Sequence, residues 1–355
     1  MEEALTRVAE VVADSQRRLG LDWRSSYSKI AACGSEAIDV ELSREEVFRA
    51  VAEGLGGAEA RGEAGAGEVS LSLSGVSVRL RLLGAERGRL LWTTSSVADV
   101  RRQSAHSAEL VSQLIMGETA RALRTEGDWH LVRLADDYHG WIRSWCVRDV
   151  DESAVGAYAA AAYAVVVASV GYVYSEPDEQ SVPVADVVAG VVLAAGRAER
   201  GFRRVALPGG RSGFLRESDI ASPPCGPPDR SRIVERAGRF LGIPYLWGGT
   251  TAKGFDCSGL VKRVFAMEGV ALPRDSDRQA LVGSLIPRED VRRARPGDLL
   301  FFGEGGTVSH VAIHAGGGAF IHSHGEVRIT SLAPGDERYE EKFARIVLFG
   351  RSVIP

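Results

Sequence analysis

The feature that most constrains this 355-residue chain is one cysteine, Cys257, placed where a glycine-rich turn runs into an apolar helix. Asp256 and Ser258 are residue types that cap the start of a helix. Cys257 is therefore predicted to lie in the first helical turn, where unpaired amides and the helix dipole favour a reactive thiolate, partly ionised near neutral pH. A buried structural cysteine is the alternative. Four apolar residues at helical spacing predict the buried face of this helix: Leu260, Val261, Val264 and Phe265.

Two histidines downstream complete a candidate catalytic set. Residues 308–322 alternate like two strands with three glycines between them, which predicts a β-hairpin. His310 and His322 fall on its two strands, where side chains on one face lie next to each other. A cysteine nucleophile needs a base within hydrogen-bond reach and a third group that orients the base. His314 and His324 are interpreted as half-exposed strand residues.

Four histidines within fifteen residues also raise a metal site as an alternative. On a helix, His310 and His314 would share one face. On a strand they would lie about 13 Å apart, too far for one zinc ion with bonds of about 2.1 Å. No metal and no cofactor is therefore expected. The β-branched residues around these histidines indicate the strand: Val308, Val311 and Ile313.

Six pieces of the sequence resemble, in order and spacing, the NlpC-type cysteine peptidases, which are papain-like enzymes that cut bacterial cell-wall peptides. The resemblance implies Cys257 as the nucleophile, His310 as the general base and His322 as the third polar residue. Tyr245 matches a family tyrosine beside the nucleophile, which assists oxyanion binding or packs through its ring. The six pieces are Pro244–Gly249, Asp256–Leu260, Pro273–Ser276 with Gln279, Arg295–Phe302, Ser309–Val311 and Phe320–His322.

Composition and charge limit what else the chain can be. Its length exceeds that of a single core and predicts two to four domains. The net charge of −4 gives no reason to expect nucleic acid or an anionic membrane as a partner. The four cysteines are widely scattered and do not form the pattern of a disulfide framework.

The N-terminus lacks the pattern of a secretory signal, because it begins acidic and continues as a charged amphipathic helix. The longest uncharged run, residues 153–175, is long enough to cross a bilayer, but it is mostly alanine and valine with glycine and tyrosine interruptions. We interpret it as a connection that leads into a buried strand at 164–167, with a membrane span as the alternative. The protein is therefore expected to be cytoplasmic.

The remaining sequence predicts an α+β multidomain chain. Two helix patterns, near 3–18 and 44–54, precede two alternating apolar runs at 69–73 and 76–82, with a loop expected at 56–67. This N-terminal α/β extension matches no family known to us, and its role is unknown.

Short strands separated by turn residues fill the segment that follows, at 111–118, 120–123, 127–132 and 138–142. The pattern is typical of a small β-barrel, and it resembles the bacterial SH3-type domains attached to cell-wall hydrolases. A weaker copy follows, and then a stiff proline-rich linker. The predicted domains are 1–90 (N-terminal extension), 91–150 and 151–220 (two SH3-type β-barrels), 221–230 (linker) and 231–355 (papain-like NlpC-type catalytic domain).

This order of domains is similar to the dipeptidyl-peptidase VI type of γ-D-glutamyl-L-diamino acid endopeptidases. The resemblance implies a murein-derived peptide with a free N-terminal L-Ala as substrate, used in cell-wall peptide recycling. Two alternatives stay open: an exported wall hydrolase or amidase on the same scaffold, and a non-catalytic wall-peptide-binding protein. The residues that match family positions in contact with substrate are Glu118, Tyr138, Asp256, Ser258 and Ser276, beside Tyr245.

Three of these substrate contacts have ordinary alternatives. Asp256 caps its helix in any case, Glu118 can be a solvated acid at a strand start, and Tyr138 can pack inside its barrel. A buried ammonium is costly unless a carboxylate pairs with it. A pocket with such a carboxylate would reject a substrate whose amine is blocked.

Overall fold

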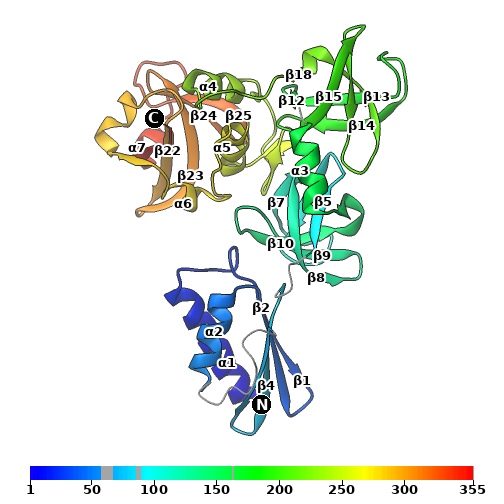
Figure 1. Ribbon diagram of the computed structural model, residues 1–355. Coiled ribbons are helices and arrows are strands. Elements are labelled where there is room, and N and C mark those ends of the chain that lie inside the picture. The colour runs from blue at the N-terminus through cyan, green and yellow to red at the C-terminus, as the bar shows by residue number, and fades with distance from the viewer. Residues whose placement is uncertain (57–66, 85–88, 162–163, 355) are drawn as a thin grey trace. The chain divides into compact units, whose positions relative to one another are not determined.

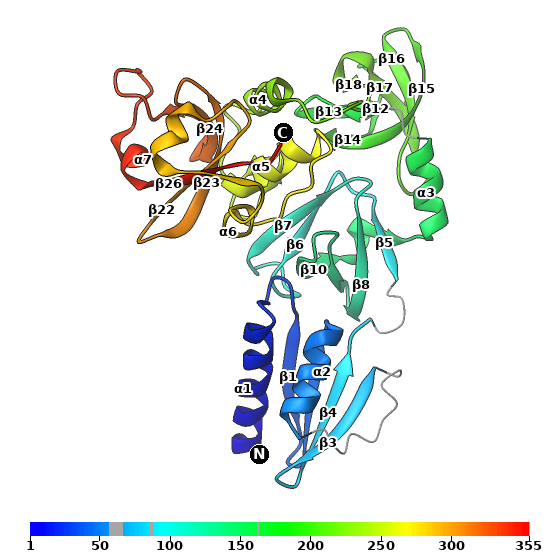
Figure 2. The same ribbon diagram turned by 60° about the vertical axis from the view of Figure 1, so that its left-hand side comes forward.

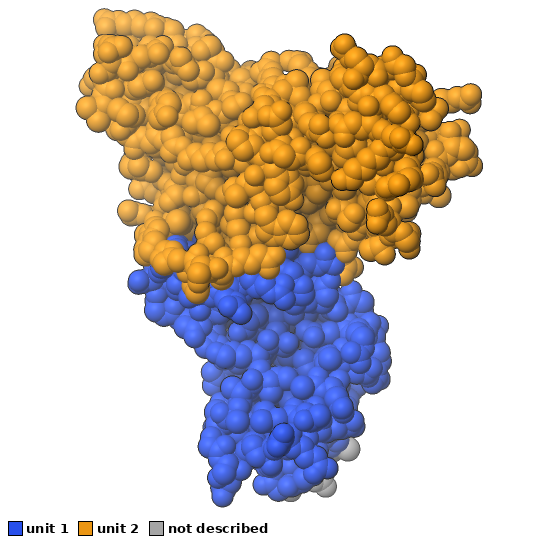
Figure 3. All heavy atoms as spheres, turned by 180° about the vertical axis from the view of Figure 1, so that it is seen from behind, with its two compact units in different colours: residues 1–91, 102–104, 119–144 blue, residues 92–101, 105–118, 145–355 orange. Residues whose placement is uncertain are grey.

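The computed structural model describes residues 1–56, 67–84, 89–161 and 164–354. Contacts divide the chain into two compact units, coloured blue and orange in Figure 3. Unit 1 comprises Met1–Leu91, Arg102–Ser104 and Thr119–Ser144, and unit 2 comprises Trp92–Arg101, Ala105–Glu118 and Trp145–Pro355. The segment predicted as the first barrel is thus shared between the two units. The loop expected at 56–67 falls almost entirely outside the described residues.

Unit 1 begins with two helices that pack on a four-stranded sheet (Figures 1 and 2). Both helices lie where their apolar periodicity predicts them, because one face of each is buried with alternate residues of the strands. Val8, Val51 and Val78 are fully buried in this core. The helices are α1 (Glu2–Arg18) and α2 (Glu45–Gly54), and the strands in sheet order are β1 (Ser28–Cys33), β2 (Ala37–Leu42), β4 (Val76–Leu82) and β3 (Glu68–Leu73).

The segment with the SH3-type pattern forms short strands close to those predicted. In unit 1, β8 (Thr119–Glu126), β9 (Trp129–Arg133) and β10 (His139–Arg143) make an antiparallel meander. In unit 2, β6 (Val97–Arg101) and β7 (Leu110–Ile115) make an antiparallel pair. The strands β5 (Leu90–Thr93) and β11 (Val147–Asp149) belong to the same segment.

A second β-rich segment of unit 2 follows helix α3 (Glu152–Ala160). This helix occupies the run expected to be a short connection, because its alanines have the highest helix propensity of all residues. The buried strand expected at 164–167 is present as β12 (Ala164–Val166). Within the described residues, no helix combines the length and hydropathy that crossing a membrane requires. The strands in sheet order are β14 (Pro183–Val188), β13 (Val170–Tyr174), β17 (Ser212–Arg216), β16 (Phe202–Ala206), β15 (Val192–Glu199), β12 (Ala164–Val166) and β18 (Ile220–Ala221).

The C-terminal part of unit 2 is a six-stranded antiparallel sheet with helices on both faces. Helices α4 (Arg230–Gly238) and α5 (Cys257–Ala266) pack on one face, and α7 (Glu341–Ile346) packs on the other. The strands in sheet order are β21 (Ser284–Ile286), β26 (Val347–Ser352), β22 (Leu299–Glu304), β23 (Thr307–Gly316), β24 (Ala319–His324) and β25 (Glu326–Ser331). The short elements β19 (Thr250–Thr251), β20 (Gly254–Phe255) and α6 (Ser276–Gln279) flank α5 in the sequence.

Candidate active site

Helix α5 begins at the cysteine, as its sequence predicts. Asp256 is the N-cap residue, and its Oδ1 accepts a hydrogen bond of 2.7 Å from the backbone N–H of Gly259. The four apolar residues chosen for the buried face are all fully buried. Cys257 therefore occupies the first turn of a capped helix whose other face is locked into the core.

The glycines around the cysteine let two backbones approach each other closely. A Cβ on Gly259 would lie 2.0 Å from the carbonyl oxygen of Gly249, and one on Gly248 would lie 2.2 Å from the carbonyl oxygen of Leu110. Gly248 also has a φ of +77°, which residues with a side chain rarely adopt. The glycine-rich sequence is thus required to bring the turn against both the helix and strand β7.

The predicted hairpin is present and brings the two histidines together. His310 on β23 and His322 on β24 are joined by a 2.8 Å hydrogen bond between Nε2 of the first and Nδ1 of the second. On its other side, His322 Nε2 lies 2.9 Å from Oγ1 of Thr330 on β25. The rings of Phe320 and Phe343 stand edge-on to the His322 ring at 4.9 Å. The predicted pairing of the two histidines is confirmed.

The thiol lies beside the strand that carries His310. The backbone N–H groups of Val311 and Ser258 favour the ionised form of Cys257, and Val311 is the next residue after His310. Because the Nε2 of His310 is bonded to His322, its Nδ1 is the nitrogen left for the thiol. A cysteine nucleophile needs its base within hydrogen-bond reach, and Nδ1 is the atom that His310 would use for this.

Burial shifts the pKa values of Cys257 and of both histidines toward their neutral forms. Burial raises the pKa of the Cys257 thiol to about 12, and the charge of the Asp256 carboxylate adds to the rise. Burial also lowers the pKa of His310 to about 3 and that of His322 to about 2. These shifts favour a neutral thiol and a neutral imidazole over the partly ionised thiol expected from the position at a helix start. Such an imidazole is free to accept a proton when the sulfur attacks.

Asp256 belongs to a buried polar network as well as capping its helix. Arg274 forms an ion pair with it and donates 2.9 Å to the hydroxyl of Ser258. That hydroxyl in turn donates to Oδ1 of Asp256, at 3.2 Å. The other carboxylate oxygen of Asp256 accepts a 3.0 Å hydrogen bond from the amide of Gly248. Sequence reasoning missed Arg274, although it lies inside a quoted family motif.

Tyr245 and Ser276 flank this network. Burial raises the pKa of Tyr245 to about 12, and the negative charges of Cys257 and Asp256 make smaller contributions in the same direction. Its hydroxyl therefore stays protonated, and it lies within the electrostatic reach of the nucleophile. Ser276 is half-buried at the start of α6, two residues after Arg274. Tyr245, Asp256 and Ser258 thus lie around the start of α5.

The two predicted residues of the barrel segment have partners of their own. The Glu118 carboxylate accepts 2.9 Å hydrogen bonds from Arg263 and from the amide of Ile115. Arg263 is six residues beyond Cys257, about 9 Å along the helix axis, so the structure does not bring Glu118 to the nucleophile. Tyr138 belongs to unit 1, where its buried ring packs edge-on against Trp23 at 5.9 Å.

A further carboxylate, which the sequence did not single out, lies just before strand β7. Glu109, just before β7, is exposed and accepts a 2.9 Å hydrogen bond from the indole N–H of Trp247, two residues after Tyr245. Gln113 on the same strand accepts from the amide of Thr250 at 3.0 Å. In the sequence, Glu109 directly precedes the same apolar strand that Glu118 follows, and this position is its signal.

Both His314 and His324 differ from the expected half-exposure, and His324 is exposed. His314 is fully buried rather than half-exposed. The reason is that β23 is a central strand with helices on both faces of its sheet, so the residues of this stretch are buried on either side. Among the described residues, no group of three or more His, Cys, Asp or Glu side chains is placed to hold a metal ion.

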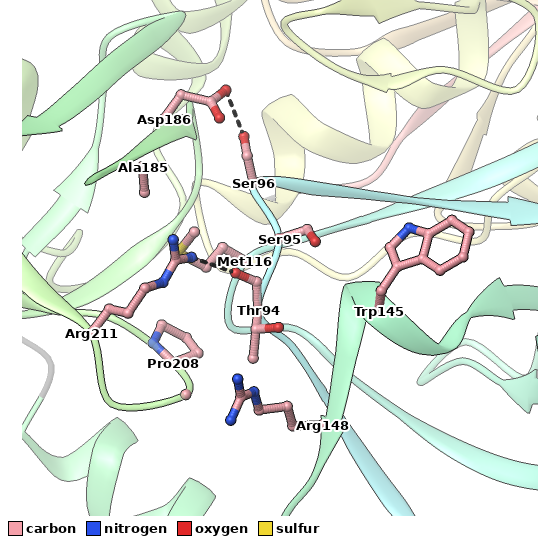
Figure 4. A pocket seen from close by; sticks show the side chains of 11 residues that line it. Thr94, Ser95, Ser96, Met116, Trp145, Arg148, Ala185, Asp186, Pro208 and Arg211 are labelled. Carbon is pink, nitrogen blue, oxygen red and sulfur yellow. Dashed lines mark hydrogen bonds between the residues drawn. The ribbon is translucent and has the colours of Figure 1, made fainter. Parts of the chain in front are cut away.

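A separate cavity of about 540 Å³ lies in unit 2 away from these residues (Figure 4). Arg211, in its wall, donates to the carbonyl oxygens of Thr94 at 3.1 Å and Val184 at 2.9 Å. Ser96 donates to Asp186 at 2.9 Å. These polar side chains are occupied by one another and by backbone, and the lining of the cavity includes none of the predicted site residues.

The buried histidines predict that acid destabilises the protein. Above about pH 6.5 they are neutral in both states. As the pH falls below that value the unfolded chain takes up protons first, because the folded pKa values of His310 and His322 are far lower. The free energy of unfolding should therefore decrease steadily from about pH 6.5 to about pH 4, as urea denaturation at a series of pH values would measure. His322→Gln should make this dependence shallower, whereas His106→Gln, at an exposed position, should not. Equal slopes for wild type and His322→Gln would contradict the prediction.

Comparison with known proteins agrees with the resemblance read from the sequence. Residues 242–347 match the model of the NlpC/P60 family, and residues 100–144 match that of the bacterial dipeptidyl-peptidase SH3 domain. The chain thus carries both kinds of domain, in the order predicted.

Curated relatives and a solved structure extend this finding. A gamma-D-glutamyl-L-lysine dipeptidyl-peptidase of Bacillus cereus is 28% identical over 71% of this chain and 79% of its own length. A protein of the same name from Bacillus subtilis is 39% identical, over 35% of this chain and 42% of its own length. The crystal structure of an NlpC/P60 family protein from Bacillus cereus superposes with a TM-score of 0.65 at 22% identity, over 75% of this chain and all of that one. At this identity the superposition establishes a shared fold.

Proposed function

Because the chain carries an NlpC/P60 domain together with an SH3-type domain, we propose that it is a cysteine endopeptidase of the γ-D-glutamyl-L-diamino acid type. Its substrate would be a murein-derived peptide that begins with a free L-Ala. The observation that carries the proposal is the thiol at the start of α5, beside the strand of a histidine whose Nε2 is bonded to a second histidine. The names of the two Bacillus relatives support the choice of bond.

The proposed reaction follows from the neutral thiol and imidazole. The sulfur of Cys257 attacks the γ-carbonyl of D-Glu while Nδ1 of His310 takes the thiol proton. The amide of Cys257, in the first turn of its helix, and the protonated hydroxyl of Tyr245 donate to the developing oxyanion. His310 then protonates the leaving amine, and with water it completes hydrolysis of the thioester.

A free N-terminus would be recognised by a carboxylate near the Tyr245–Trp247 loop. Glu109 has the right position for this, since one of its oxygens already bonds Trp247 and its side chain is exposed. Glu118 would first have to leave Arg263. The network of Asp256, Ser258 and Arg274 holds the end of this loop through the amide of Gly248. We therefore expect Glu109 rather than Glu118 to pair with the substrate ammonium.

The test of the proposal is turnover of L-Ala-γ-D-Glu-L-lysine, or its diaminopimelate analogue, with and without an N-acetyl group. A site built to pair with an ammonium leaves its carboxylate unpaired when the amine is blocked. We expect kcat/KM for the free peptide to exceed that for the blocked peptide by at least about a hundredfold. Equal use of both would contradict the free-amine specificity and favour a general wall hydrolase. Binding without turnover would favour a peptide-binding protein.

Glu109→Gln should reduce kcat/KM for the free peptide by about tenfold or more, because the ammonium loses a charged partner. The same change should have little effect on the N-acetyl peptide. Glu118→Gln is the matched control: it removes a carboxylate from the same segment, but one that is bound to Arg263. It should leave the ratio of the two kcat/KM values unchanged. A loss of discrimination in Glu118→Gln alone would reverse the assignment.

The domain plan and the location are part of the same proposal. Residues 151–220, with their seven-stranded sheet, would be a second SH3-type barrel, and residues 1–90 an extension of unknown role. A substrate with a free amine is a released fragment rather than intact wall, which is consistent with peptide recycling in the cytoplasm. Recovery of the protein from outside the cell in a fractionation experiment would contradict this location.

A further inference from the structure

We infer that Thr330 is a positioning residue of this active site, whose hydroxyl accepts the last hydrogen bond of a chain that allows His310 to become positively charged. The inference rests on the proposed function, because it concerns the pair formed by Cys257 and His310. It adds a fourth residue to that set, from a strand outside the hairpin.

Three consecutive strands carry the chain of hydrogen bonds. His310 lies on β23, His322 on β24 and Thr330 on β25, and the two donor–acceptor distances are 2.8 and 2.9 Å. His322 and Thr330 are both fully buried. The rings of Phe320 and Phe343 pack edge-on against His322, and the His324 ring stacks on it at 5.8 Å. The positive charge of Arg328 and His324 also acts on His322 and disfavours its protonation.

The protonation of His310 fixes the direction of this chain. When the thiol proton moves to its Nδ1, the S–H bond breaks, an N–H bond forms, and the ring carries a proton on both nitrogens. Its Nε2–H must then donate to Nδ1 of His322, which has to be unprotonated. His322, neutral because burial lowers its pKa to about 2, then carries its proton on Nε2. That N–H points at Thr330, whose oxygen has to accept.

Without an acceptor at position 330, the other tautomer of His322 is favoured. A buried N–H that lacks a partner is costly, so the ring would place its proton on Nδ1 instead. This proton would face Nε2 of His310. In the imidazolium form of His310, the Nε2–H of His310 and the Nδ1–H of His322 would then point at each other and repel. Removing the hydroxyl should thus disfavour the charged pair selectively. In the neutral resting site the two rings can still share one hydrogen bond in either tautomer.

The experiment follows alkylation of Cys257 by iodoacetamide as a function of pH in the full-length protein, which needs no substrate. At neutral pH the reactive thiolate exists only with its proton on His310, so the rate forms a plateau. At high pH the thiol ionises without His310, and the rate rises again. Alkylation forms an S–C bond and releases iodide. His310→Ala defines the profile that lacks the plateau.

Thr330→Val keeps the size and branching of the side chain and removes its hydroxyl. We expect the plateau near pH 7 to fall about tenfold, with the alkaline limb unchanged and with kcat lowered in parallel at constant KM. Thr330→Ser should restore the plateau. Thr125→Val is the matched control, since Thr125 Oγ1 makes the same kind of bond, 2.9 Å to Nδ1 of His130, in unit 1.

Two outcomes would overturn the inference. One is a normal plateau in Thr330→Val, and the other is an equal drop at neutral and alkaline pH, which indicates a general structural role. If Thr330→Val does not fold, Thr330→Cys replaces the oxygen by a weakly accepting sulfur, and the same drop is expected. In a His322→Ala background, Thr330→Val should cause no further loss. A wild type without any plateau would contradict the catalytic pair itself, which separates failure of the proposed function from failure of this inference.

Discussion

Cys257→Ala is expected to lower kcat of the proposed peptidase by at least about 10⁴-fold while the protein keeps its fold, because the covalent route needs the sulfur. The substitution removes one atom from a half-buried position, and alanine is accepted in a helix better than any other residue. Hydrolysis of the free tripeptide, followed by chromatography of the products, measures the loss.

Two controls make this result specific. Cys225→Ala removes an exposed cysteine and should retain full activity. A circular dichroism spectrum and melting temperature of Cys257→Ala close to those of wild type would exclude unfolding as the cause. Turnover by Cys257→Ala within tenfold of wild type would show that another group is the nucleophile.

Much of the site could be predicted because its parts are encoded by local patterns. The cap at Asp256, the apolar stripe after Cys257 and the alternation around His310 and His322 each depend on residues a few positions apart. A strand period and a glycine turn determine which side chains face each other across a hairpin. For the same reason the start of α5 and the hydrogen bond between the histidines agree with the sequence reading.

Other features depend on tertiary packing, which local patterns do not contain. Glu118 is bound by Arg263, 145 positions away, which no local pattern reveals. The thiol was expected to ionise because of its place at a helix start, but burial and the nearby Asp256 carboxylate act in the opposite direction and are stronger. His314 is buried because helices cover both faces of its sheet, and the strand pattern alone does not contain that information.

Arg274→Met is expected to lower the free energy of unfolding by about 3–5 kcal/mol, because it leaves the Asp256 carboxylate buried without its cation. The Arg274 side chain is 2% exposed and that of Asp256 is 10% exposed, so water does not replace the lost partner. Urea denaturation followed by circular dichroism measures the change. Arg239→Met, which breaks an exposed pair with Glu235, is the control and should cost about 0–1 kcal/mol.

The same substitution should also reduce activity, because the two oxygens of Asp256 hold the amides of Gly248 and Gly259 on either side of Cys257. A second change separates loss of charge balance from loss of shape. Asp256→Asn with Arg274→Met removes both charges yet keeps an oxygen that accepts from Gly259, so it should be more stable than Arg274→Met alone. If the double variant were instead less stable by the sum of the two single effects, the ion pair would not be the interaction that holds this turn.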